Sequence, residues 1–271
     1  MPLKVAHVVQ YDRVTTRYLL RDGCGNIWWG SSARTISSIC AADPTCLPKL
    51  APLDPEAFYP WAKPGTKEYK GALDDPNVFI KKQDFLMHRC FDQGKAPEYF
   101  KNLMVREVEV CELLAKNPHP NVCKYLGVVL DTADLITGIA YKRYDSDLFT
   151  AVEEKAFDYA RIPHVVAAVD AGMKHLHSLA LVHGDLRPEN IFLRGEDEVV
   201  VGDFDACYCV GEPLEHKIGA RDWWPAKYGR ERYAEVEIDY LTVAKLPSWF
   251  KVWSVEHERR GKAAAANGRA Y

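Results

Sequence analysis

The pattern of apolar and polar residues predicts mainly strands in the first half of the chain. Residues 1–36 are typical of short strands and turns, and NVFIKKQDF (77–85) is typical of a strand because it holds β-branched and aromatic residues. Residues 118–131 and 135–144 predict two further strands. Residues 41–76, which precede the strand at 77–85, are rich in Pro, Asp and Lys, which predicts a long irregular insertion with one short helix.

Helical spacing dominates the rest of the chain. In residues 101–117 the apolar side chains of Val108, Cys111 and Leu114 recur every three residues, which predicts a helix. Three further helices are predicted at 149–154, at 162–180 and at 238–253, the last interrupted near Pro247. The order of elements predicts an α+β protein with two lobes: a β-rich first lobe with one key helix, and a reduced, mostly helical second lobe.

The same pattern divides the chain into segments, with a cleft expected at the link between the lobes. The predicted segments are an N-terminal extension and insertion that form part of the first lobe (1–76), the core of the first lobe (77–141), a hinge (142–147), the reduced second lobe (148–257) and a flexible tail (258–271).

Composition narrows the class of protein. The 271 residues are 48% hydrophobic and 27% charged, which is typical of a soluble globular protein. A net charge of −3 gives no reason to expect a nucleic acid or a membrane as partner. No apolar run is long enough for a signal peptide or a membrane span, and the eight cysteines contain no Cys-x-x-Cys pair. We therefore expect reduced thiols in an intracellular, cytoplasmic protein.

Polar residues that are costly to bury without partners are concentrated in LVHGDLRPENIF (181–192) and VVVGDFDA (199–206). The apolar residues between them predict a loop that enters a short hairpin, with the polar groups meeting at one end. One Asp and one Asn can hold Mg²⁺ together with the oxygens of a nucleotide. A separate Asp can accept the proton of a hydroxyl, as phosphoryl transfer requires.

These stretches resemble the eukaryotic protein-kinase superfamily. The matched positions are His183, Asp185, Arg187 and Asn190 of the catalytic-loop signature, the triplet Asp203-Phe204-Asp205, and Asp239 on the helix that supports the loop. The resemblance covers about 77 to 253 and implies the two-lobed kinase fold. It also implies structural roles for three of these residues: packing of His183 against the triplet, burial of Phe204, and anchoring of loop amides by Asp239.

The resemblance implies catalytic roles for the other matched residues. Asp185 would orient the acceptor hydroxyl and take its proton. Asn190 and Asp203 would hold Mg²⁺, with Mn²⁺ as a possible substitute. Arg187 stands where Lys is usual and would offset charge on the transferring group.

Upstream, Lys81 resembles the strand lysine that contacts the phosphates of ATP, and Glu107 is the preferred helix partner that would fix it. Lys82 and Glu109 are the alternatives. Strand alternation allows only one of the two lysines to face inward. For the helix, Glu107 is preferred because apolar residues follow it three, four and seven positions later.

IAYKRYDSDL (139–148) resembles the hinge that binds the adenosine part of ATP. The resemblance places Tyr141 at the gatekeeper position, the adenine-facing backbone at Lys142, Arg143 and Tyr144, and Asp147 near the ribose.

Several positions depart from the family pattern. Gly184 replaces the Arg that normally meets a phosphate of the activation loop, so switching by phosphorylation of that loop is not expected. Asp205 replaces the glycine of the triplet; the alternatives are that it joins the metal shell or that it faces water, and we expect the latter. A glycine-rich loop is not recognisable: Gly23, Gly25 and Gly30 are candidates that a long insertion separates from Lys81, and Gly71 is closer but lone. The short chain after the supporting helix predicts a reduced second lobe.

The sequence thus predicts an ATP- and Mg²⁺-dependent phosphotransferase whose acceptor is the hydroxyl of a protein Ser or Thr. One alternative is a catalytically inactive pseudokinase that acts as a binding or scaffold protein. A second alternative is a small-molecule kinase of the aminoglycoside or choline phosphotransferase type, because those enzymes share the His-x-Asp…Asn pattern. The predicted partners are ATP and a hydroxyl-bearing substrate, protein or small molecule.

Overall fold

The computed structural model of the chain describes residues 2–24, 26–48, 51–83, 96–215, 217–225 and 233–254. Its contacts divide it into two units. The first contains Met1–Lys70, Ile80–Val105 and Gly127–Ile139, and the second contains Gly71–Phe79, Arg106–Leu126 and Ala140–Tyr271. The predicted tail, 258–271, lies outside the described residues.

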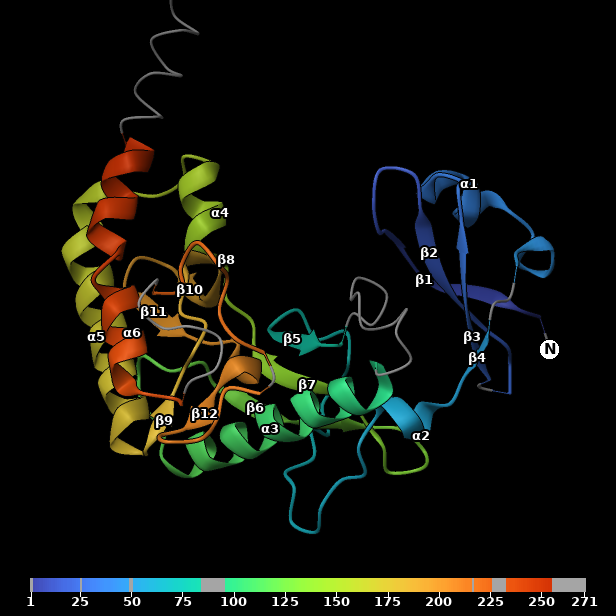
Figure 1. Cartoon of the computed structure of the whole chain (residues 1–271), viewed down its shortest axis with the longest axis horizontal. Helices are drawn as coiled ribbons and strands as arrows, with labels where there is room; N and C mark the ends of the chain where they lie inside the picture. Colours follow the sequence, from blue (N-terminus) through green and yellow to red (C-terminus); the bar gives the residue numbers. More distant parts are fainter. Residues whose placement is uncertain are drawn as a thin grey trace, which may run out of the picture. The chain divides into compact units, whose positions relative to one another are not determined.

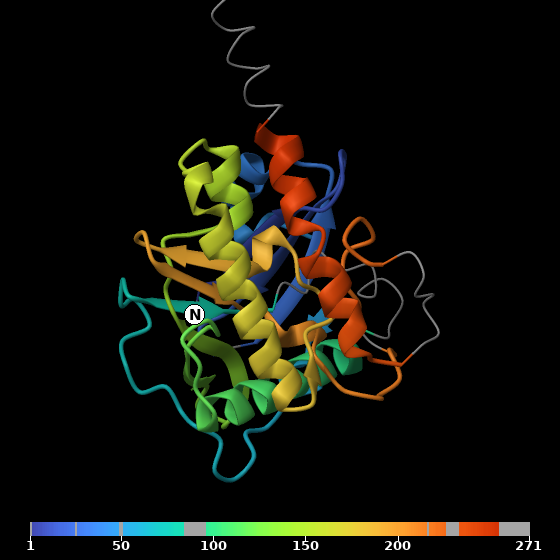
Figure 2. The same cartoon turned by 90° about the vertical axis from the view of Figure 1, so that its left-hand side faces the viewer.

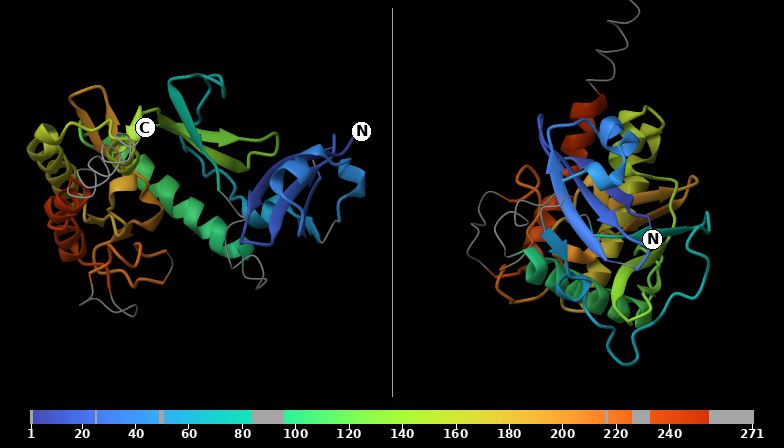
Figure 3. Two further views of the ribbon diagram at one scale, coloured as in Figure 1. Left: turned by 90° about the horizontal axis from the view of Figure 1, so that it is seen from above. Right: turned by 90° about the vertical axis from the view of Figure 1, so that its right-hand side faces the viewer.

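The N-terminal segment forms a four-stranded antiparallel sheet in the order β1-β2-β3-β4 (Figures 1 and 3). Its strands are β1 (Lys4–Gln10), β2 (Thr16–Arg21), β3 (Ile27–Ser32) and β4 (Ala51–Leu53). Helix α1 (Ile36–Ala41) follows β3 and is capped by the side chain of Thr35, which accepts the Ser38 amide. Its Ile39 is buried with Tyr18 and Leu20 of β2, so this segment has a small core of its own.

This sheet also contains the candidates for a glycine-rich loop. Gly23 lies in the turn between β2 and β3, Gly30 lies in β3, and Gly25 lies outside the described residues. A Cβ added to Gly30 would come within 2.4 Å of the Pro48 carbonyl oxygen, so close packing accounts for that glycine. None of the described candidates belongs to the sheet that carries Lys81.

A second sheet has the order β5-β7-β6, built from β5 (Val78–Lys81), β6 (Tyr125–Leu130) and β7 (Ile136–Lys142). Within the described residues, β7 is the central strand, and β5 and β6 are the two edge strands. The predicted insertion is largely irregular but contains β4, a 3₁₀ turn (Pro44–Cys46) and helix α2 (Pro55–Phe58). Its end runs beside the second sheet, where Glu68 pairs with Val128.

Helix α3 (Ala96–Lys116) follows the predicted helical phase but begins five residues earlier than the apolar pattern indicates. Its buried positions include Met104, Val108, Cys111 and Leu114, which recur at helical spacing. The acidic residue Glu98 lies in its first turn and Lys116 in its last, where each complements the helix dipole.

The second unit is mostly helical. Its helices are α4 (Leu148–Glu153), α5 (Ile162–Ser178), α6 (Val236–Val243) and a final helix over 246–254 (Figures 1 and 2). The predicted interruption of the last helix is confirmed, because residues 244 and 245 form a turn and Pro247 stands at the start of the new helix. Short strands complete the unit: β8 (Ser146–Asp147), β9 (Leu181–Val182), β10 (Ile191–Arg194), β11 (Glu198–Val201) and β12 (Tyr208–Cys209).

The seven described cysteines are all free thiols. Cys111, Cys123 and Cys207 are buried, as expected for small apolar core residues, whereas the other four are exposed. Among the described helices, none combines the length and the apolar character that a membrane crossing needs.

Candidate active site

The hairpin of β10 and β11 brings the polar residues of the two motifs to one end, as predicted. Ile191 at the start of β10 pairs with Val201 at the end of β11. Asn190, just before β10, and Gly202, just after β11, therefore lie at the same end of the hairpin. The Gly202 amide donates to the Asn190 carbonyl at 3.0 Å and closes this end. Asp203 follows directly, with φ 65°, a left-handed conformation that costs a non-glycine residue about 1 kcal/mol. The end of the hairpin therefore holds an amide and a carboxylate close together.

Asp185 lies in the loop between β9 and β10 and is 8% exposed. The Ala220 amide donates to its Oδ1 at 3.0 Å, and the Asn190 side-chain amide donates to its backbone carbonyl at 2.7 Å. Burial raises the pKa of the Asp185 carboxyl, while Lys217 and the Ala220 amide lower it in part. The net effect is a raised pKa, which suits a carboxylate that accepts a proton.

Asp239 of α6 anchors this loop, as predicted. Its side chain is fully buried, and its oxygens accept the His183 amide at 2.8 Å and the Gly184 amide at 3.0 Å. His177 of α5 contacts the same carboxylate at 2.9 Å. The carboxylate thus satisfies two buried backbone amides that precede Asp185.

His183 is structural, also as predicted. Its ring is fully buried and packs edge-to-face against Phe204, with 5.8 Å between the ring centroids. Its Nε2 lies 3.0 Å from the Gly202 carbonyl, so this nitrogen carries the proton and donates. The ring therefore connects the loop that contains Asp185 to the Asp203 turn.

Gly184 stands where the family has Arg, and the backbone explains the exchange. Its φ is +74°, and a Cβ added there would lie 2.5 Å from the Ala206 carbonyl oxygen. Both the conformation and the close approach require glycine at this position. A side chain that could meet a loop phosphate cannot be placed here without moving the backbone.

We expect Gly184→Ala to lower the free energy of unfolding by about 1–3 kcal/mol more than Gly195→Ala, because the added methyl collides with backbone. Gly195 is a matched control, since its φ is +57° and nothing lies within 4 Å of its added Cβ. Urea unfolding of both variants measures the difference. Equal losses would show that only the left-handed conformation matters at Gly184.

Lys217 places its ammonium group among three carboxylates of the site. Its Nζ lies 2.6 Å from Asp205 Oδ1, 3.6 Å from Asp203 Oδ2 and 3.7 Å from Asp185 Oδ2. Burial lowers the pKa of Lys217, but the three carboxylates outweigh burial and leave the pKa raised. The expectation that Asp205 faces water is wrong, because this side chain is 17% exposed and pairs with Lys217.

Arg187, the cation predicted to offset charge, is paired with Glu189. Its Nε donates to Oε2 at 2.9 Å and its Nη2 lies 2.7 Å from Oε1, which is a two-point contact. Its role toward a transferring group stays a prediction.

The donor set at the end of the hairpin fits a magnesium ion. The side-chain nitrogen of Asn190 is engaged with the Asp185 carbonyl, so its oxygen is the atom left to meet a cation, and Asp203 follows β11 at the same end of the hairpin. Mg²⁺ takes one or two such oxygens from a protein and the rest from phosphate and water. Among the described residues there is no cluster of three or more His, Cys, Asp or Glu side chains placed to hold a metal ion alone.

Lys81 and Glu107 lie on β5 and α3. Lys81 is half-buried while Lys82 is exposed, and Glu107 is 4% exposed while Glu109 is exposed. The Tyr141 hydroxyl donates to Glu107 Oε1 at 2.8 Å. Since Lys81 and Glu107 fall in different units, the ion pair between them stays a prediction.

The predicted hinge residues have structural partners of their own. The Lys142 ammonium lies 2.7 Å from both Glu198 oxygens, and the Arg143 guanidinium donates to the Val78 carbonyl at 2.8 Å. Tyr144 stacks on Phe192, with 6.0 Å between the centroids. Adenine binding by this backbone stays a prediction.

Asp147 caps helix α4. Its Oδ1 accepts the Thr150 amide at 2.8 Å and its Oδ2 accepts the Thr150 hydroxyl at 2.7 Å. The capping role is enough to explain an Asp at this position even if it binds no ligand. Contact between Asp147 and a ribose therefore stays a prediction.

Sequence patterns missed a contact between α3 and the segment after the Asp203 turn. The Arg106 guanidinium donates to Glu212 Oε2 at 2.8 Å and to the Cys207 carbonyl at 3.2 Å. It also lies over the Tyr208 ring, 4.4 Å from its centroid. Lys217 was missed as well, although the acidic Asp205 in a glycine position signals that a buried counter-charge is needed.

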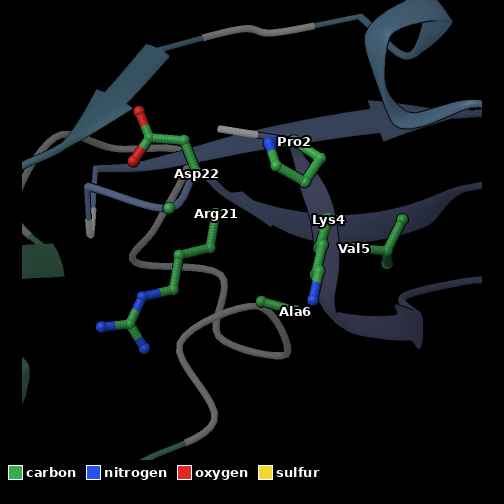
Figure 4. A pocket seen from close by; sticks show the side chains of 7 residues that line it. Pro2, Lys4, Val5, Ala6, Arg21 and Asp22 are labelled. Atoms are coloured by element: carbon green, nitrogen blue, oxygen red, sulfur yellow. The ribbon is translucent and has the colours of Figure 1, made fainter.

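A separate hollow of about 400 Å³ lies on the N-terminal sheet. Figure 4 shows Lys4 and Arg21 projecting to one side of it and Asp22 to the other. Of the residues considered for the site, Gly23, a candidate for the glycine-rich loop, lines this hollow, whereas the residues predicted to be catalytic or to bind metal do not.

Comparison with known proteins places the chain beside protein kinases. The family described as "Protein kinase domain" matches residues 78–244, which is more than half of the chain. The human "MAPK/MAK/MRK overlapping kinase" is 27% identical over 159 residues, or 57% of this chain and 35% of that protein. The human "Serine/threonine-protein kinase/endoribonuclease IRE2" is 31% identical over 150 residues, or 53% of this chain and 14% of that protein.

The chain therefore spans about a third or less of the length of these two relatives. A chain in the crystal structure of the yeast RNA Pol II CTD kinase CTDK-1 complex superposes with a TM-score of 0.48 at 19% identity. The superposition covers 62% of this chain and 54% of that one.

Proposed function

Because the chain belongs to the protein kinase family, we propose that it transfers the γ-phosphoryl group of ATP to the hydroxyl of a protein Ser or Thr. The observation that carries the proposal is the grouping of Asp185, Asn190 and Asp203. The Asn190 side chain donates to the Asp185 carbonyl, and the Lys217 ammonium lies 3.7 and 3.6 Å from the Asp185 and Asp203 carboxylates. Relatives named as serine/threonine-protein kinases support the acceptor class.

In the proposed reaction, the acceptor oxygen forms a bond to the γ-phosphorus as the bond from that phosphorus to the β–γ bridging oxygen breaks. ADP leaves, and the hydroxyl proton passes to Asp185 Oδ2. The Ala220 amide holds Oδ1, so the second oxygen is the one directed to the substrate. Partial burial and a raised pKa suit Asp185 to this step.

The Asn190 oxygen and the Asp203 carboxylate would hold the magnesium ion that accompanies ATP. When bound, this ion neutralises charge on the phosphates. Lys81 would contact the α- and β-phosphates, and the backbone of Lys142–Tyr144 would meet the adenine. Asp239 and His183 keep the Asp185 loop and the Asp203 turn in fixed register.

ATP labelled at the γ-phosphate, offered with mixed proteins and with metabolite pools, tests the proposal. Label in protein that depends on Mg²⁺ is the expected result. Label only in small molecules would favour the aminoglycoside or choline type of kinase. If calorimetry at millimolar Mg²⁺ detects no uptake of a non-hydrolysable ATP analogue, the proposal fails.

A pseudokinase is the second candidate, favoured by one observation. Within the described residues no glycine-rich hairpin lies beside β5, so nothing described there covers the phosphates. Nucleotide binding without transfer to any acceptor would support this candidate.

Activity should not depend on phosphorylation of the segment after Asp203. Arg106 already forms an ion pair with the Glu212 carboxylate, and Gly184 has no side chain that could bind a phosphate. We expect phosphatase-treated protein to keep its activity, whereas Glu212→Gln lowers it about two- to fivefold, the range for a half-exposed ion pair.

Glu215→Gln is the control for this variant, because Glu215 is exposed in the same segment. Initial rates of labelled transfer compare the three proteins. Loss of activity on phosphatase treatment would contradict the expectation.

A further inference from the structure

Lys217 is held by one carboxylate and stands near two others. Of these three carboxylates, only that of Asp205, at 2.6 Å, lies within hydrogen-bond length of its Nζ. Asp203 and Asp185, at 3.6 and 3.7 Å, are beyond that length. An ammonium has three donors, so within the described part of the chain two of them keep no hydrogen-bond partner.

The position of the Lys217 ammonium indicates a role beyond its ion pair with Asp205. It lies between the carboxylate that would take the hydroxyl proton and the one that would hold the metal ion. In the proposed reaction the transferring phosphoryl group occupies that interval, and its charge needs nearby cations. A lysine that served only as counter-ion to Asp205 would not need to place its ammonium near the Asp185 and Asp203 carboxylates as well.

The loop cation expected to do this work is engaged elsewhere. Within the residues that the structure describes, both polar contacts of the Arg187 guanidinium are to Glu189, two positions along the chain. Lys217 is therefore the cation that the structure places beside Asp185.

We propose that Lys217 contacts the γ-phosphoryl oxygens during transfer and takes the part expected of Arg187, with Asp205 as its anchor. This inference rests on the proposed phosphotransferase function. It also accounts for the Asp at 205, where the family has glycine, because the carboxylate positions the ammonium. Lys217 forms no covalent bond, and its ammonium keeps its protons throughout.

A different role for the same ammonium predicts the opposite behaviour. If it competed with the divalent ion for the carboxylates, its removal would strengthen binding of Mg²⁺ and ADP. If it contacts the transferring group, its removal weakens only complexes that contain a mimic of that group.

Calorimetry with ADP and Mg²⁺, with and without aluminium fluoride, separates these roles, since aluminium fluoride mimics the transferring phosphoryl group. We expect Lys217→Met to weaken binding of the aluminium fluoride complex by about tenfold or more and to change ADP–Mg²⁺ binding by less than about threefold. Lys217→Arg should recover most of the loss. Lys174→Met is the control, because Lys174 is 62% exposed on α5 and pairs with Asp170.

Asp205→Asn provides a second route if Lys217→Met does not fold. Losing the anchor should weaken the aluminium fluoride complex in the same direction. Undiminished binding of that complex by the Lys217 and Asp205 variants would overturn the inference and leave the proposed function standing. Tighter ADP–Mg²⁺ binding by Lys217→Met would also overturn the inference, because it would show that the ammonium competes with the divalent ion for the carboxylates. Wild-type protein that binds neither complex would overturn the proposed function itself.

Discussion

Replacing Asp185 by Asn should lower the rate of phosphoryl transfer by about 10²–10⁴-fold, the range contributed by a positioned general base. The amide oxygen of Asn can still accept the Ala220 amide, which now bonds Oδ1 at 3.0 Å. The second position becomes an NH₂ group, which cannot take a proton from the acceptor hydroxyl. It would also face the Lys217 ammonium, which lies 3.7 Å from Oδ2.

Rates from labelled ATP, together with calorimetry of ADP–Mg²⁺, measure this effect. Nucleotide affinity should stay near that of the wild type, because neither predicted metal ligand is changed. Asp197→Asn, in the exposed turn between β10 and β11, is the control for a lost surface carboxylate. Transfer at the wild-type rate by Asp185→Asn would remove the proposed role of Asp185.

Replacing Asp239 by Ala should lower the free energy of unfolding by about 2–6 kcal/mol, since it leaves two buried amides unpaired at about 1–3 kcal/mol each. Those amides belong to His183 and Gly184, which the carboxylate binds at 2.8 and 3.0 Å. Their loss also frees the loop that holds Asp185, so transfer should fall together with stability.

Urea unfolding of two further variants isolates the hydrogen bonds. Asp239→Asn keeps one acceptor oxygen and should cost less than Asp239→Ala. Glu237→Ala changes an exposed acidic residue in the same first turn of α6, so it tests the loss of an acidic side chain near this helix N-terminus. A loss from Asp239→Ala no larger than that from Glu237→Ala would show that the anchor is not needed.

The periodicity of the sequence was enough to predict most elements and the side that each buries. Apolar spacing on α3 selects Glu107 over Glu109 as the inward acid, and the structure buries the first and exposes the second. Strand alternation allows only one of Lys81 and Lys82 to face inward, the family motif favours Lys81, and the structure half-buries Lys81 and exposes Lys82. These predictions succeed because period and burial are local consequences of backbone geometry.

The motif around Asp185 also determines its own local structure. Its spacing specifies a loop, a hairpin and a turn, and the pairing of Ile191 with Val201 follows from them. Asp239 could be predicted as the anchor of this loop only because the family pattern supplies a partner 54 positions away from Asp185.

Contacts between distant, non-periodic segments were decided by the tertiary structure alone. Lys217 belongs to an irregular segment whose path brings it among three carboxylates, and no spacing in the sequence indicates that approach. Arg106 and Glu212 are 106 positions apart. Gly184 is required by the Ala206 carbonyl, which packs against it from beyond the Asp203 turn. Local chemistry thus determined which side chains can carry a phosphotransferase site, whereas the path of the chain decided which cation stands beside Asp185.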